Sequence, residues 1–176
     1  MAEIYIRRSG AISTEPASAT NPFPVSVEKT APIRDVIFPT PYREIPGIGT
    51  AAIYASGDAL GAKFSLAVPK SGIIETAIML DLDAEGTEIE IWLFSQDFTG
   101  TADNSAFAVS DSDLNGLEAI ISITNFTSSA NNYVGIANNL GLAYSAPYGV
   151  LYCQCVTRST PNIAVGALPK VALRIR

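Results

Sequence analysis

The chain contains no histidine among its 176 residues. Without imidazole, the Ser-His-Asp and Cys-His nucleophilic systems and the common zinc sites are excluded. Cysteine is nearly as scarce, because Cys153 and Cys155 are the only two. Two thiolates without histidine cannot complete a metal site within one chain. We therefore expect no metal, no cofactor and no enzymatic activity.

Charge and long apolar runs are limited as well. Only 16% of the residues are charged, and the net charge of −6 disfavours nucleic acid as a partner, because phosphate binding needs clustered Lys and Arg. No stretch approaches the roughly 20 apolar residues of a membrane-spanning helix, so we expect no membrane partner. No basic and apolar leader opens the sequence, and we expect no Sec-type export.

The chain is instead rich in apolar residues. They make up 48% of the sequence, and the mean hydropathy is +0.26. This composition is unusual for a small soluble monomer and typical of a β-sandwich that also buries surface against other subunits. We therefore predict association with further subunits.

The clearest pattern spans residues 72–94, which we predict to form a long β-hairpin with its turn at residues 84–86. Side chains alternate between the faces of a strand, so five residues of the first arm are expected to share the buried face: Ile74, Thr76, Ile78, Leu80 and Leu82. On the second arm Ile89, Ile91 and Leu93 share a face, while Trp92 and Phe94 extend the outer one.

Further strands are expected at about 51–55, 62–68, 107–109, 118–126, 133–136, 141–144, 148–157 and 171–176. Residues 95–105 are predicted to be an exposed loop, and 110–114 a single helical turn capped by Ser110. Short strands separated by turn residues are typical of a sandwich or barrel. The predicted fold class is therefore all-β, an antiparallel sandwich over residues 50–176.

The first 49 residues differ from the rest, and we predict an extended arm. Seven of the eleven prolines lie there, and proline disfavours helices and central strands. Ile4 and Ile6 alternate with Tyr5, as in a short strand added to the sheet of a neighbouring molecule; a floppy tail is the alternative. Seven more apolar residues are too many for a disordered linker: Phe23, Val25, Val27, Ile33, Val36, Ile37 and Phe38.

The candidate chemical sites are weak. Asp81, Asp83 and Glu85 precede Gly86 as in a calcium loop, but Trp92 stands where the closing glutamate is needed. Four loop aspartates could hold the acid pair of a glycoside hydrolase, although no spacing selects a pair: Asp97, Asp103, Asp111 and Asp113.

The cysteines Cys153 and Cys155 share a face of the predicted strand 148–157. That strand is apolar on both faces, so we expect it to lie centrally or at a subunit contact. The two residues are at the long limit of separation for a disulfide. We predict two reduced, buried thiols, with an intersubunit bridge as the alternative.

Four stretches of the sequence resemble a group of tailed-bacteriophage virion proteins: YASGDALG (54–61), IWLFSQDF (91–98), DNSAFAVSDSDL (103–114) and LYCQCVTRSTP (151–161). Members of this group are small jelly-roll-like β domains associated with the capsid. The resemblance covers residues 50–176 and implies a cement or decoration protein, made in the host cytoplasm and located on the capsid surface. It implies the major capsid protein as partner, self-association as a trimer or dimer, and a terminal arm that grips neighbours.

On this hypothesis the partner-binding residues lie at both ends of the chain: Ile4, Tyr5, Ile6, Phe23, Val25, Ile37, Phe38, Arg174 and Arg176. The basic residues near the termini either meet an acidic partner surface or are solvated strand ends. One alternative function is a receptor- or carbohydrate-binding tail module, which predicts an exposed patch of aromatic, acid and amide side chains around residues 92–104. The other is the glycoside hydrolase.

Overall fold

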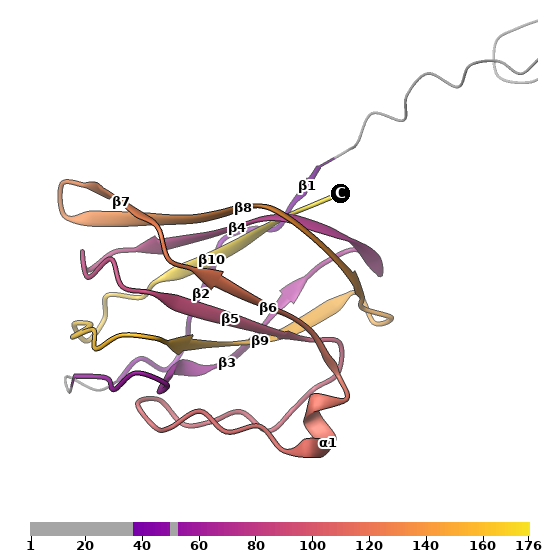
Figure 1. The fold of residues 1–176 in the computed structure, drawn as a ribbon, viewed down its shortest axis with the longest axis horizontal. Coiled ribbons are helices and arrows are strands. Elements are labelled where there is room, and N and C mark those ends of the chain that lie inside the picture. Colours follow the sequence, from indigo (N-terminus) through magenta and orange to yellow (C-terminus); the bar gives the residue numbers. More distant parts are fainter. Residues whose placement is uncertain (1–36, 50–52) are drawn as a thin grey trace, which may run out of the picture. The chain divides into compact units, whose positions relative to one another are not determined.

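A computed structural model describes residues 37–49 and 53–176 of the chain. Two antiparallel sheets pack face to face, which confirms the all-β sandwich (Figure 1). The elements are β1 (Phe38–Pro39), β2 (Arg43–Glu44), β3 (Ala59–Ala67), β4 (Ser71–Asp81), β5 (Ile89–Phe94), α1 (Asp111–Leu114), β6 (Leu117–Ile123), β7 (Phe126–Ser129), β8 (Asn132–Ser145), β9 (Val150–Thr157) and β10 (Lys170–Ile175).

The larger sheet has the strand order β1-β10-β4-β8-β7, and β2 also pairs with β10. The smaller sheet has the order β3-β9-β5-β6. The predicted hairpin over residues 72–94 is therefore wrong, because β4 and β5 lie in different sheets. Residues 82–88 carry the chain from one sheet to the other, so the two arms bury their apolar faces against each other across the sandwich instead of pairing edge to edge.

The smaller sheet follows the sequence pattern. Ile89, Ile91 and Leu93 of β5 are fully buried, as the alternation predicts. Phe94 shares the outer face with Trp92, as predicted, because their ring centroids lie 6.5 Å apart, but it is buried there. Phe98 then packs on Phe94, with 4.2 Å between the ring centroids. The outer side of this sheet is thus partly covered by the chain that follows β5.

The larger sheet departs from the pattern within β4. Ile74 is buried as predicted, but beyond it Ala77 and Met79 face the core, and Ile78 is only half-buried. The reason is a β-bulge: Thr76 pairs with Arg174 and Ile74 with the next residue of β10, so Glu75 is an extra residue in β4. A bulge reverses the side-chain alternation beyond it. The prediction that Thr76, Ile78, Leu80 and Leu82 face inward is therefore wrong.

Strand β9 lies between β3 and β5, in the interior of its sheet. This position confirms the prediction, drawn from the two apolar faces of residues 148–157, that the strand lies centrally. Cys153 and Cys155 are both free and buried, as predicted. Burial raises the pKa of the Cys155 thiol to about 12 and that of Cys153 well above its usual value, so both are protonated at neutral pH.

Residues 38–48 belong to the sandwich, although the sequence pattern placed the boundary at residue 50. Both β1 and β2 pair with β10, and Ile45 and Ile48 are part of the hydrophobic core. The backbone N–H of Ala62 donates to the carbonyl of Pro46 at 2.7 Å, which fixes this segment against β3. The sandwich thus begins earlier in the chain than expected. Residues 1–36 lie outside the described part.

Some of the other predicted elements form and others do not. The turn α1 is confirmed, with the Ser110 hydroxyl accepting from the N–H of Asp113 at 3.1 Å. No strand forms at 53–55 or 107–109; Ala106 makes only an isolated bridge with Asp58. The two strands expected at 133–136 and 141–144 are one long strand, β8. Residues 171–176 are correctly placed in a strand, β10, apart from the terminal Arg176.

Candidate functional site

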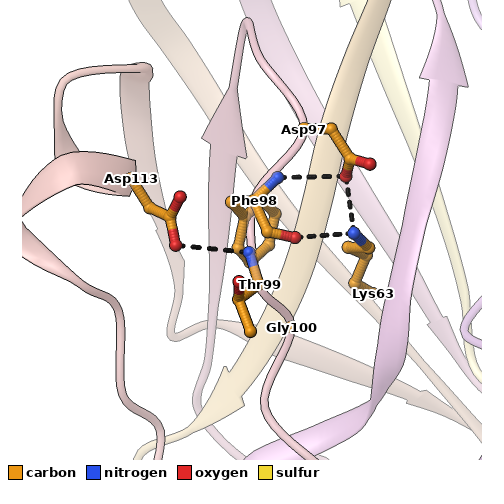
Figure 2. Close-up of a pocket in the computed structure, with 6 residues that line it drawn as sticks. All are labelled: Lys63, Asp97, Phe98, Thr99, Gly100 and Asp113. Carbon is orange, nitrogen blue, oxygen red and sulfur yellow. Dashed lines mark hydrogen bonds and ion pairs between the residues drawn. The ribbon is translucent and has the colours of Figure 1, made fainter.

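The hollows beside Asp97 lie where the chain leaves β5. Asp97 lines two adjoining depressions, of about 470 and 460 Å³. The first is lined by Lys63, Asp97, Phe98, Thr99, Gly100 and Asp113 (Figure 2). The second is lined by Ser95, Gln96, Asp97, Pro147, Tyr148 and Tyr152. Both are open to solvent.

Asp97 is held in place by neighbours on two sides. Its Oδ1 accepts from Lys63 Nζ at 2.5 Å and from the N–H of Phe98 at 3.0 Å. Figure 2 shows the Lys63 ammonium reaching over Phe98 to this carboxylate and to the Phe98 carbonyl, which is 2.6 Å away. The hydrogen bond from Lys63 lowers the pKa of Asp97, so the carboxylate is ionised at neutral pH. Its Oδ2 has no hydrogen-bond partner among the described residues.

Tyr148 stands on the rim of the second hollow, at the tip of the turn between β8 and β9. Its side chain is 79% exposed. The turn is closed by a hydrogen bond from the N–H of Gly149 to the carbonyl of Ala146, 2.8 Å long. Pro147 suits the second position of such a turn, and Gly149 has a φ of 72°.

Two backbone hydrogen bonds anchor this turn to the chain that enters β4. The N–H of Val68 donates to Gly149 at 3.0 Å, and the N–H of Ala146 donates to Lys70 at 2.7 Å. The Tyr144 hydroxyl adds a third link, donating to the carbonyl of Pro69 at 3.0 Å. The exposed ring of Tyr148 is therefore carried by a firmly attached turn.

The loop that follows Asp97 is fastened to the smaller sheet by Gln154. This side chain is completely buried in β9. Its Nε2 donates to the carbonyls of Thr101 and Gly61, at 2.6 and 3.1 Å, and its Oε1 accepts from the N–H of Thr101 at 2.9 Å. Further along, the Phe107 ring packs on Trp92, with 5.0 Å between centroids. The loop that forms the first hollow is thus fixed at two points.

The aspartates predicted as a possible catalytic pair have separate structural partners. Asp103 accepts from the Tyr54 hydroxyl and the N–H of Gly61, both at 2.7 Å. Burial of the Tyr54 hydroxyl and, to a lesser extent, its hydrogen bond to Asp103 raise the pKa of Tyr54 well above its ordinary range. Asp113 accepts from the N–H of Thr99 at 3.2 Å. These two carboxylates serve to connect loops.

Two of the three acids at residues 81–85, Asp81 and Asp83, also have backbone partners. Asp81 is buried, and its carboxylate accepts from the N–H groups of Asp83 and Gly86, at 2.9 and 2.6 Å. Asp83 accepts from the N–H of Ala164. Within residues 37–49 and 53–176, no group of three or more His, Cys, Asp or Glu side chains is placed to hold a metal ion.

The structure brings four of the predicted partner-binding residues together. Phe38 of β1 pairs with Ile175, next to Arg174 of β10. Ile37 and Phe38 are 55% and 45% exposed, and Arg176 forms an ion pair with Glu75 at 2.9 Å. These residues lie at the edge of the larger sheet formed by β1 and β10. The other predicted residues lie outside the described part of the chain: Ile4, Tyr5, Ile6, Phe23 and Val25.

A second apolar surface, which sequence reasoning missed, lies on the outer side of the larger sheet. Paired residues share a face of the sheet, so the pairings of β4 with β10 and β8 define its members. We call this set the outer aliphatic face: Ile78, Leu80, Val134 and Ile136, with the buried Ala172 beside Ile78. None of the described strands, nor α1, covers it (Figure 1). Its signal in the sequence was the aliphatic run of β4, which was assigned to the core because the bulge was not foreseen.

None of the described helical residues forms a segment long and apolar enough to cross a membrane. Comparisons of the chain with models of protein families, with curated proteins and with solved structures found no match.

Proposed function

We propose that this protein is a structural virion protein, a capsid cement or decoration protein that binds between subunits of the major capsid protein of a tailed phage. The observation that carries the proposal is the outer aliphatic face. A sheet that faces water on one side normally carries polar residues there. Here Ile136 is 42% exposed, and Ile78, Leu80 and Val134 are half-buried beside it.

The charged residues around this face favour a protein partner. Lys170 lies beside Leu80 in the sheet and pairs with Glu44 at 2.9 Å, while Arg174 lies beside Thr76. An apolar centre with a polar, charged rim is the usual composition of a protein interface. Ile37 and Phe38, at the β1 edge of the same sheet, are exposed as well. Such a protein stabilises a shell by contacts alone, and the arm adds a second point of attachment.

The proposal is tested with capsid shells of the encoding phage that lack this protein. Mixed with such shells, the full chain should co-sediment with them, and electron cryomicroscopy should show it at the joints between capsomers. Ile136→Lys should weaken binding by about tenfold or more, because it removes the apolar contact of a side chain that is 42% exposed and places a charge in the interface.

Leu114→Lys is the matched control, because Leu114 is also aliphatic and is 41% exposed, but it lies in α1 on the other side of the sandwich. It should bind as the wild type does. Light scattering of the free protein should give the mass of a dimer or trimer. A chain that stays in the supernatant, or that is found on the tail, would refute the proposal.

The second candidate, a receptor- or carbohydrate-binding module of a tail or spike, is favoured by one specific observation. It requires an exposed aromatic ring near acid and amide side chains, and the second hollow combines Tyr148 with Asp97 and Gln96. Position on the particle separates the two functions, because a tail module would be absent from purified shells.

A further inference from the structure

We propose that the two hollows joined at Asp97 form a binding site for a neutral oligosaccharide. This inference deepens the second candidate function and does not depend on capsid binding, because no residue of the outer aliphatic face lines either hollow. A pyranose ring has one face of C–H groups and a rim of hydroxyls. A protein binds it with an aromatic ring against the face, and with carboxylate and amide groups at the hydroxyls.

The aromatic component is Tyr148. An exposed tyrosine in a floppy loop would lose conformational entropy on binding, but this one sits on a turn fixed by Pro147 and by the hydrogen bonds at Val68 and Ala146. Because the backbone of the turn is already ordered, a contact with Tyr148 costs less conformational entropy than a contact with a residue of a disordered loop. Tyr152 of β9 lines the same hollow and supplies a second aromatic surface.

The polar component is Asp97 together with Gln96. The Lys63 ammonium and the Phe98 N–H both bind Asp97 Oδ1, which fixes the carboxylate and leaves Oδ2 to accept from a hydroxyl. Gln96 is exposed, and its amide has no partner among the described residues, so it can donate to one hydroxyl and accept from another. The Phe98 ring beneath packs on Phe94, so the backbone at this point is anchored.

The charges in the hollows favour a neutral sugar over a phosphate or other anion. Lys63 is already paired with Asp97, and Asp113 is a further carboxylate on the wall of the first hollow. An anionic ligand would meet two carboxylates and no unpaired cation among the residues that line the hollows. The two depressions share Asp97, so a ligand longer than one sugar unit can contact both.

The test is an NMR titration of the ¹⁵N-labelled full chain with three neutral trisaccharides: maltotriose, cellotriose and tri-N-acetylchitotriose, each to about 10 mM. A shallow, open site should bind at least one of them with a Kd on the order of 1 mM. The amide resonances of Gln96, Asp97, Tyr148 and Gly149 should shift together. Tyr148→Ala and Asp97→Asn should each weaken binding by about tenfold or more.

Two variants are matched controls. Tyr42→Ala removes an exposed tyrosine that does not line either hollow, and Asp111→Asn removes an exposed carboxylate of α1. Both should bind as the wild type does, and unchanged resonances outside the site would show that each variant is folded. The absence of shifts with all three sugars, shifts confined to another surface, or full affinity in Tyr148→Ala would each overturn the proposal. Tyr148→Ala should still co-sediment with capsid shells, so a failure of this site is distinguishable from a failure of the proposed function.

Discussion

Replacing Gln154 with alanine should release the loop that forms the first hollow. The wild-type side chain is completely buried and makes three hydrogen bonds, two of them to Thr101. A neutral hydrogen bond contributes about 0.5–1.5 kcal/mol, and a buried carbonyl left unpaired adds to the loss. In Gln154→Ala, Thr101 can turn to water, but the carbonyl of Gly61 remains inside. We therefore expect the free energy of unfolding to fall by about 2–4 kcal/mol.

Two measurements separate the global loss from the local one. Urea unfolding gives the change in stability, and chymotrypsin cleavage after Phe98 and Phe107 reports opening of the loop, since the Phe98 ring is buried in the intact protein. Cleavage at both sites should accelerate. Gln96→Ala is the control, because Gln96 is an exposed glutamine in the same segment. A loss under about 1 kcal/mol, or an equal loss in the control, would contradict the assignment of Gln154 as the anchor of this loop.

Three further predictions concern other parts of the sandwich. The hydrogen bond from Arg158 to Glu90, 2.5 Å long, lowers the pKa of Glu90 below its ordinary value of 4.5. The stabilisation from this ion pair is therefore present above that pH and is lost as the pH falls below it. The difference in unfolding free energy between wild type and Glu90→Gln should shrink as the pH is lowered below 4.5, and a constant difference would count against the ion pair. Cys153 and Cys155 are buried and protonated, so neither should react with a disulfide reagent until urea unfolds the chain, and rapid labelling of the native protein would disprove their burial. Gly135→Ala would place a Cβ 2.6 Å from side-chain atoms of Ile123 and Phe126, and this overpacking should cost about 1–3 kcal/mol in a thermal or urea melt; an unchanged midpoint would show that the two side chains can move aside.

The sequence was sufficient for the fold class because strand alternation is a local property. Ile89, Ile91 and Leu93 show it without interruption, and all three are buried. The capped turn at Ser110 is equally local, since its hydrogen bond spans only three residues. The pairing of strands was not predictable in this way. Strands β4 and β5 are neighbours in the sequence, but the partners of each come from distant parts of the chain.

The candidate site was only partly visible in the sequence. Residues 92–104 were expected to carry an aromatic, acid and amide patch if the protein binds sugars, and Gln96 and Asp97 lie there. The exposed ring is Tyr148, some fifty residues later, and only the pairing of β5 with β9 brings the β8–β9 turn near the end of β5. Trp92 and Phe98, the aromatics of the expected patch, are instead packed against Phe107 and Phe94. The sequence Pro147-Tyr148-Gly149, a tyrosine between two turn-forming residues, was the one available signal for this exposed ring.

The extra residue Glu75 changes the side of the sheet to which the β4 side chains point. On one side of it Ile74 points into the sandwich, and on the other Ile78 and Leu80 point away. A chain shortened by Glu75 alone would keep each of these side chains on its present side, because removal of the bulge restores simple alternation between Ile74 and Thr76. Loss of one residue further along, at Ile78, would instead exchange the two sides of the remaining strand. Insertion or deletion of a residue at this one position can therefore bend or straighten the sheet, while the outer aliphatic face keeps the same side chains.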